Sequence, residues 1–176
     1  IAASNGVEAA DLARRGFISG DDGIAGPQGF IATHADAPDF EAPWADPPPG
    51  RFLFEDVKYK LHACCHGTHA MIEALRAVPS VAPEAVKGLH LRVNPRWLKV
   101  CDIKAPRTGL EVKFSYAWLA AMVLAGVDTA ADVTYRDALA SDPTLAEIAG
   151  RVTVAGDAAL ADTATEVEIV TADGRT

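Results

Sequence analysis

The stretch Lys60-Leu-His-Ala-Cys-Cys-His-Gly-Thr-His69 gathers in one short segment the side chains most used in catalysis and metal binding. It follows a strand-like run at 52–57 and leads into a helical pattern at 66–78. A junction between strand and helix exposes side chains and backbone N–H groups to a ligand. We therefore predict that the functional site lies at this junction.

Composition places the chain among ordinary globular proteins and excludes some partners. Its 176 residues suffice for one domain with a core, and its net charge is −8. This acidity argues against nucleic acid or an anionic membrane as the partner, but a local group of Lys and Arg can still bind a small anion. The longest apolar run, 116–127, is too short to span a bilayer, and no signal peptide is evident.

The cysteines favour a reducing compartment. The chain has three, and two of them, Cys64 and Cys65, are neighbours that rarely bridge each other. Reduced thiols are the simplest interpretation, so we expect a cytoplasmic protein.

The apolar periodicity predicts a mixture of helices and strands. Helices are expected at 5–15, 66–78, 114–125, 135–140 and 143–149, and strands at 52–57, 86–93, 151–155 and 165–171. We expect Asn5 to cap the first helix in a capping box with Glu8, and Gly16 to end it. Phe114, Trp118 and Met122, four residues apart, are expected in the core.

This order of elements predicts an α+β fold, a small mixed sheet with the helices from 66 and 114 on one face. We divide the chain into a terminal helix at 1–16, a loop-rich connection at 17–50 and an α+β domain at 51–176. His90 should lie on the polar face of its strand. The end, 173–176, is typical of a hairpin turn whose return strand is missing, which is what we expect of a fragment of a longer protein.

Five short motifs follow one another along the chain. They are Ala9-Ala-Asp-Leu-Ala-Arg-Arg-Gly-Phe17, Gly26-Pro-Gln-Gly-Phe30, Lys60-x4-Cys65-x3-His69 leading into Ala70-Met-Ile-Glu-Ala74, Pro106-x-Thr-Gly-x-Glu-x-Lys-Phe-Ser115, and Asp173-Gly174. In this order and spacing they resemble the MmgE/PrpD family, which includes 2-methylcitrate dehydratase, cis-aconitate decarboxylase and iminodisuccinate epimerase.

The resemblance implies a subunit with a large helical domain and a smaller α+β domain, usually in a homodimer. This chain is similar to the last helix of the helical domain followed by the α+β domain. The family's Asp/His/Thr catalytic cluster would then lie in the missing helical domain of the same polypeptide, and the fragment alone should be inactive. The implied function is that of a lyase, a 2-methylcitrate dehydratase-like enzyme acting on a di- or tricarboxylic acid. The alternative is an iminodisuccinate-type epimerase, an isomerase, and neither is expected to use a cofactor.

The resemblance also assigns residues. Lys60 matches the family's active-site lysine, His69 a histidine at the start of the following helix, and Lys113 the lysine of the Lys-Phe-Ser motif. Cys65 stands where cis-aconitate decarboxylase has His and other members often have Cys, which disfavours that decarboxylation. His62-Ala63 replaces a proline that members often carry near Cys65.

The chemistry of these side chains fits proton transfer at a carbon next to a carboxylate. Lys60 can bind a substrate carboxylate or act as the proton donor or acceptor. Cys65 is either a second acid/base or an inert buried thiol, and His69 either a proton shuttle or a helix-start donor. Arg107 and Lys113 are candidates for holding a substrate carboxylate, with two solvated cations as the alternative.

Two interpretations from other classes stay open. Cys64, Cys65, His66 and His69 are all possible zinc ligands, but structural zinc sites are usually built from two separated pairs, so we predict no metal. The second interpretation is a non-catalytic substrate-binding or dimerisation domain. In that case Lys60→Ala should leave turnover of the intact protein unchanged.

Overall fold

The computed structural model describes residues 1–39, 41, 45–46, 50, 55, 57–79 and 81–174. They form two compact units, Ile1–Val57 and Lys58–Thr176. The strand predicted at 52–57 lies outside the described residues except for Glu55 and Val57, and so does the end of the predicted hairpin turn at 175–176.

The first unit contains helix α1 (Ala2–Arg14), which begins earlier than predicted. Its N-cap is Ile1, with no side-chain cap, and the Asn5 N–H donates to the Ile1 carbonyl at 2.8 Å. The predicted capping box is therefore wrong, because Asn5 already lies inside the helix. Gly16 ends α1 as predicted, with φ of +85°, and its N–H donates to the Ala13 carbonyl.

A second helix, α2 (Phe30–His34), interrupts the region predicted to be a loop. The Asp22 carboxylate accepts hydrogen bonds from the Ile24 and Ala25 N–H groups, and these bonds lower the pKa of Asp22. A Cβ on Gly29 would lie 2.7 Å from the Ile24 carbonyl oxygen. The glycines that predicted an open loop therefore permit a tight turn that leads into α2.

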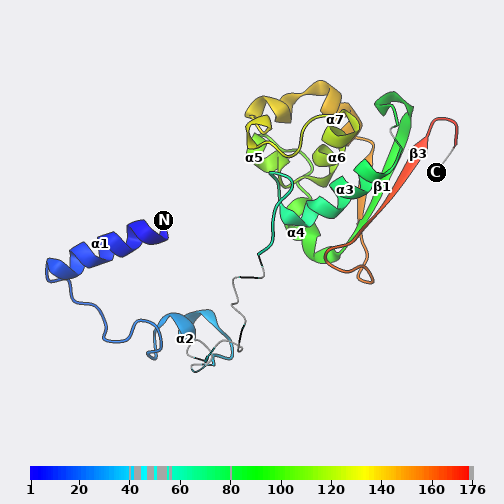
Figure 1. Cartoon of the computed structure of the whole chain (residues 1–176). Coiled ribbons are helices and arrows are strands. Elements are labelled where there is room, and N and C mark those ends of the chain that lie inside the picture. Colours follow the sequence, from blue (N-terminus) through cyan, green and yellow to red (C-terminus); the bar gives the residue numbers. More distant parts are fainter. Residues whose placement is uncertain are drawn as a thin grey trace. The chain divides into compact units, whose positions relative to one another are not determined.

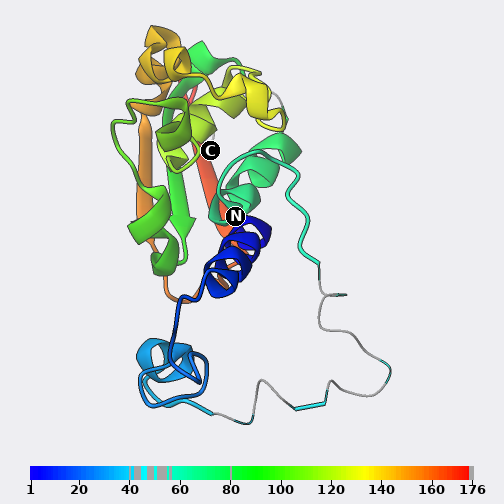
Figure 2. The same cartoon turned by 90° about the vertical axis from the view of Figure 1, so that its left-hand side faces the viewer.

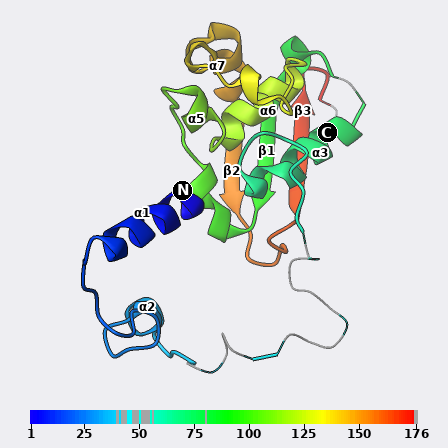
Figure 3. The same cartoon turned by 60° about the vertical axis from the view of Figure 1, so that its left-hand side comes forward.

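The second unit contains a three-stranded mixed sheet in the order β2-β1-β3 (Figures 2 and 3). β1 (Val86–Val93) has the predicted bounds and lies in the centre. It pairs in parallel with β2 (Val152–Gly156) and antiparallel with β3 (Thr165–Thr171). Leu89 and Leu91 of β1 are buried while His90 is exposed, as the alternation predicted.

Helices cover one face of this sheet (Figure 1). The longer ones are α3 (His69–Ala77), α6 (Tyr116–Leu124) and α7 (Pro143–Ala149), and the short ones are α4 (Leu98–Cys101) and α5 (Gly109–Val112). The 3-10 turns are η3 (His66–Thr68), η4 (Pro83–Ala85), η5 (Pro95–Trp97), η6 (Asp132–Thr134) and η7 (Asp137–Ser141). The α+β prediction is confirmed, with η7 in place of the helix predicted at 135–140.

Helix α6 forms the centre of the core. Met122 is fully buried and Trp118 nearly so, as predicted, and Leu119 is fully buried beside them. Phe114, also predicted in the core, is only half-buried and lies before the helix, because Ser115 is the N-cap and accepts a hydrogen bond from the Trp118 N–H. Among the described residues, no helix is long and apolar enough to span a bilayer.

The approach of α5 to the segment before η7 leads to a first test. A Cβ on Gly109 would lie 2.1 Å from the Tyr135 carbonyl oxygen, whereas one on Gly150 would lie 3.4 Å from its nearest neighbour. We expect Gly109→Ala to lower the free energy of unfolding by about 2–3 kcal/mol, because backbone must move. Gly150→Ala is the control and should change it by less than about 0.5 kcal/mol. Urea denaturation measures both, and equal stabilities would contradict this packing.

Candidate functional site

The segment 60–69 is hydrogen-bonded to the α5–α6 connection. The Cys65 N–H donates to the Lys113 carbonyl at 3.0 Å. The Thr68 hydroxyl donates to the Cys65 carbonyl at 2.7 Å and contacts the Cys64 Sγ at 3.2 Å. The predicted helix at 66–78 is confirmed as η3 followed by α3. These bonds fix the coil-to-helix junction on which the predicted site residues lie.

Three of the predicted site residues line one pocket of about 330 Å³, which we call the lysine pocket. Lys60, Cys65 and Lys113 meet there, although Lys113 is distant from the others in sequence. The remaining walls are Ala63, Cys64, Leu110, Phe114 and Asp132. The two lysine ammonium groups can neutralise the charge of a small carboxylate bound beside the Cys65 thiol.

Both lysines are held in place by neighbours. The Lys60 ammonium donates to the Cys64 carbonyl at 3.2 Å. Lys113 forms an ion pair with Asp132, and its ammonium lies 4.9 Å from the centre of the Tyr135 ring. The Asp132 side chain is 82% exposed, so this pair is weak and can open to an anionic ligand.

The three cysteines differ in environment. Cys64 is buried, burial raises the pKa of its thiol, and its Sγ contacts Thr68, so it is a packing residue. Cys65 is half-buried in the wall of the lysine pocket. Burial, followed by the neighbouring Cys65 side chain, raises the pKa of the Cys101 thiol. Of the three, Cys65 is the thiol placed to meet a ligand.

The structure does not bring Arg107 to this pocket. Its guanidinium donates to the Glu111 carboxylate at 3.3 Å, and its side chain is 86% exposed. The Arg107 backbone N–H also donates to Glu111, at 2.6 Å, and these bonds hold the pKa of Glu111 below its usual value. Arg107 therefore serves the start of α5 in the described structure.

His69 lies in a second pocket, of about 560 Å³, which we call the histidine pocket. Its lining residues come from the coil at Lys58, from η3, α3 and η5, and from the β2–β3 connection: Lys58, His66, Gly67, His69, Ala70, Glu73, Arg96, Trp97, Asp162 and Thr163. The His69 ring centre is 5.1 Å from that of His62 and 5.0 Å from that of His66. His69 is thus separated from the lysine pocket that holds the other predicted catalytic residues.

Two features next to or within the histidine pocket depend on contacts between distant segments. His62, beside the pocket, is buried and contacts Glu73 and Thr129, each at 2.8 Å. Trp97 lines the pocket, and its ring lies so close to Gly67 that a Cβ there would be 2.4 Å away. Gly67, between His66 and Thr68, was the sequence signal for a close approach at this position. The sequence does not show which side chain makes that approach.

The zinc alternative finds no ligand set in the part of the chain that the structure describes. Within those ranges no three His, Cys, Asp or Glu residues are placed to hold a metal ion. The Cys64 Sγ contacts the Thr68 hydroxyl, and Cys65 lines the lysine pocket, whereas His66 and His69 line the histidine pocket.

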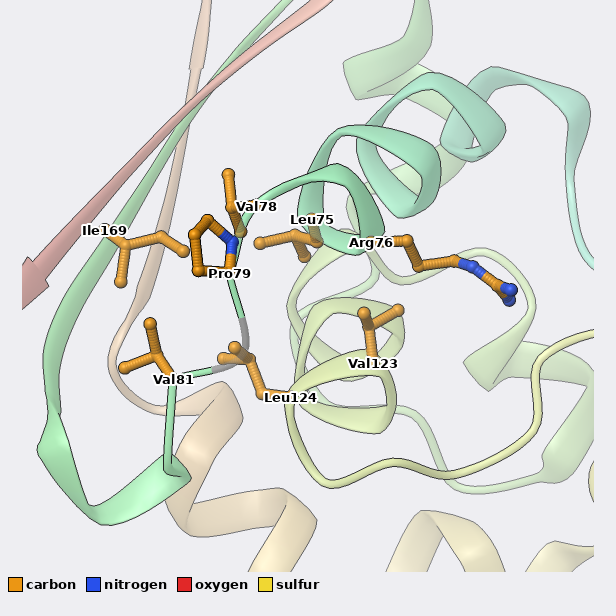
Figure 4. A pocket seen from close by; sticks show the side chains of 8 residues that line it. All are labelled: Leu75, Arg76, Val78, Pro79, Val81, Val123, Leu124 and Ile169. Carbon is orange, nitrogen blue, oxygen red and sulfur yellow. The ribbon is translucent and has the colours of Figure 1, made fainter.

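A third pocket, of about 340 Å³, lies beside the C-terminal end of α3 (Figure 4). Leu75, Val78, Pro79, Val81, Leu124 and Ile169 give it an apolar lining, and the guanidinium of Arg76 extends away from Pro79 and Val81. Its lining offers no acid or base suited to a reaction, so we do not treat it as a candidate catalytic site.

The second unit is a small α+β domain with the lysine pocket at a coil-to-helix junction. The chain belongs to the MmgE/PrpD family, since residues 62–176 match the sequence model described as MmgE/PrpD C-terminal domain. The resemblance found in the motifs is thereby confirmed, and Lys60 lies just before the matched range. A comparison with curated proteins gives no match.

The burial of His69 leads to a prediction about pH. Burial, and next the positive charges that His62, His66 and Lys60 can carry, lower the pKa of His69 below its ordinary 6.5, while the Cys64 carbonyl opposes them. Between pH 6.5 and the lower folded pKa, the unfolded chain binds more protons than the folded one, so stability falls as the pH falls. We expect His69→Gln to flatten this dependence in urea denaturation at pH 7 and pH 5.

His90 provides the control, because it is exposed on the opposite face of the sheet. His90→Gln should keep the pH dependence of the wild type. A His69→Gln variant with the same loss of stability as the wild type between the two pH values would contradict the lowered pKa of His69.

Proposed function

We propose that this chain is the α+β part of an enzyme that transfers a proton next to a carboxylate of a di- or tricarboxylic acid. The family is generally enzymatic. The observation that carries the proposal is the meeting of Lys60, Cys65 and Lys113 in the lysine pocket. We propose that the reaction also needs a helical domain of the same polypeptide, and that the enzyme is a cytoplasmic homodimer.

The charges of the lysine pocket support this chemistry. Removing a proton next to a carboxylate adds negative charge to an anion, and a nearby cation lowers the cost of that charge. Lys60 is held by the Cys64 carbonyl at the pocket wall and can neutralise it, while Lys113 can bind a second carboxylate by opening its pair with Asp132. Cys65, which lines the same pocket, can act as the acid or base.

A 2-methylcitrate dehydratase-like reaction is our first choice of activity, and epimerisation of an iminodisuccinate-type substrate is the second. Both begin with the same proton removal and differ in the next step. A dehydratase expels the hydroxyl group, whereas an epimerase returns a proton to the other face. Decarboxylation of cis-aconitate ranks below both activities, because Cys65 stands at the position where the decarboxylase has His.

Deuterium exchange tests the proposal. The intact polypeptide is incubated in D2O with 2-methylcitrate, citrate, cis-aconitate or iminodisuccinate, and NMR follows deuterium entering the carbon next to a carboxylate. We expect exchange with one of these acids in the wild type. Lys60→Ala should slow it by at least about 10²-fold, because the charge of the transition state loses its cation.

The matched control is Lys87→Ala, which removes an exposed lysine of β1 from outside both pockets. It should exchange at the wild-type rate. Exchange that survives in Lys60→Ala would instead favour a non-catalytic role for this domain, with the reaction carried by the helical domain. An absence of exchange with every acid would remove the substrate class.

A further inference from the structure

Lys113, in the lysine pocket, has two neighbours that differ in charge and in burial. The Tyr135 ring centre lies 4.9 Å from its ammonium group, and Tyr135 is buried, with its hydroxyl donating to the Thr129 carbonyl at 3.0 Å. The Asp132 carboxylate forms an ion pair with the same ammonium group, and the Asp132 side chain is 82% exposed. Lys113 therefore has one fixed neutral neighbour and one charged neighbour in solvent.

The Asp132 side chain can leave this pair while Lys113 stays in place. An exposed ion pair is worth little, because water solvates both groups when they separate. The Lys113 side chain itself is only 20% exposed, so the pocket wall continues to hold it. Its ammonium group also remains attracted to the face of the Tyr135 ring. Rotation of Asp132 into solvent would thus leave a positioned cation for another carboxylate.

Lys60 lines the same pocket but has a different kind of partner. Its ammonium group donates to a neutral acceptor, the Cys64 carbonyl, at 3.2 Å. A carboxylate that enters the pocket can meet Lys60 without displacing Asp132, whereas it reaches Lys113 only by replacing Asp132. The two cations of the pocket are therefore not equivalent toward an anion.

The covalent attachment of Asp132 to the chain decides which anions can replace it. A group held close to its partner competes at an effective concentration on the order of millimolar. A free monocarboxylate at a lower concentration cannot displace it. A dicarboxylate with one end bound at Lys60 presents its other end to Lys113 within the same complex, so it competes with Asp132 on equal terms.

We propose that Asp132 is a specificity-determining residue of the lysine pocket, which occupies Lys113 until a dicarboxylate bound at Lys60 displaces it. Asp132 thereby keeps monocarboxylates away from Lys113 and also weakens the binding of the second carboxylate of the ligand. The proposal rests on the proposed use of the lysine pocket as a carboxylate site, but it requires no reaction there.

Succinate and butyrate test the proposal, because both have four carbons and only succinate has a second carboxylate. Each is titrated into the ¹³C,¹⁵N-labelled 176-residue chain, and NMR follows the N–H groups of residues 60–65. Asp132→Asn keeps the size of the side chain and removes its charge. It should bind succinate about 5-fold more tightly than the wild type does, while the affinity for butyrate at Lys60 should change by less than about 2-fold.

The Asp132 carboxylate gives a second readout in the wild type. Its ¹³C resonance should move when succinate is added, because the carboxylate leaves Lys113, and should stay in place when butyrate is added. A resonance that moves equally with both acids would overturn the proposal.

Asp128→Asn is the matched control. It removes the same charge a few residues away, outside the lysine pocket, and Asn keeps an acceptor for the Ala130 N–H, which Asp128 now binds at 2.8 Å. It should leave the succinate affinity within about 2-fold of the wild type, because solvent and salt screen its charge. Equal gains in the two variants, or no gain in Asp132→Asn, would overturn this inference alone. Failure of both the wild type and Asp132→Asn to bind succinate would also remove the lysine pocket as a carboxylate site.

Discussion

The hydrogen bond from the Cys65 N–H to the Lys113 carbonyl, 3.0 Å long, joins the 60–69 segment to the α5–α6 connection, and the lysine pocket depends on it. The neighbouring Cys64 carbonyl accepts a hydrogen bond from the Lys60 ammonium at 3.2 Å. One short run of backbone therefore positions both lysines at the same pocket. A shift of this run would separate the two cations and change the charge that a carboxylate meets there.

The elements that sequence predicted well are those whose signals are local. The bounds of β1 follow from the alternation of Leu89 and Leu91 with His90, and α7 follows Asp142, whose carboxylate accepts from the Thr144 and Leu145 N–H groups. The structure places Lys60, Cys65 and Lys113 in one pocket, while their roles came from the family resemblance and stay predictions.

Other features depend on contacts between distant segments and could not be predicted. Helical spacing puts His66 and His69 on one face but does not say that this face turns away from the lysine pocket. Arg107 was expected to meet a substrate because it is a cation in a turn, yet the structure pairs it with Glu111 within the same turn. Asn5 was misjudged because its capping pattern lies one turn inside a helix that begins at Ala2.

The close approach of Trp97 to Gly67 has a consequence for how this chain can vary. The indole lies where any side chain at position 67 would stand, and the Gly67 carbonyl accepts a hydrogen bond from the Tyr116 hydroxyl at 2.8 Å, which prevents the backbone from retreating. A larger residue at 67 is therefore tolerated only after the residue at 97 has become smaller. Across relatives, the residues at positions 67 and 97 should therefore covary in size.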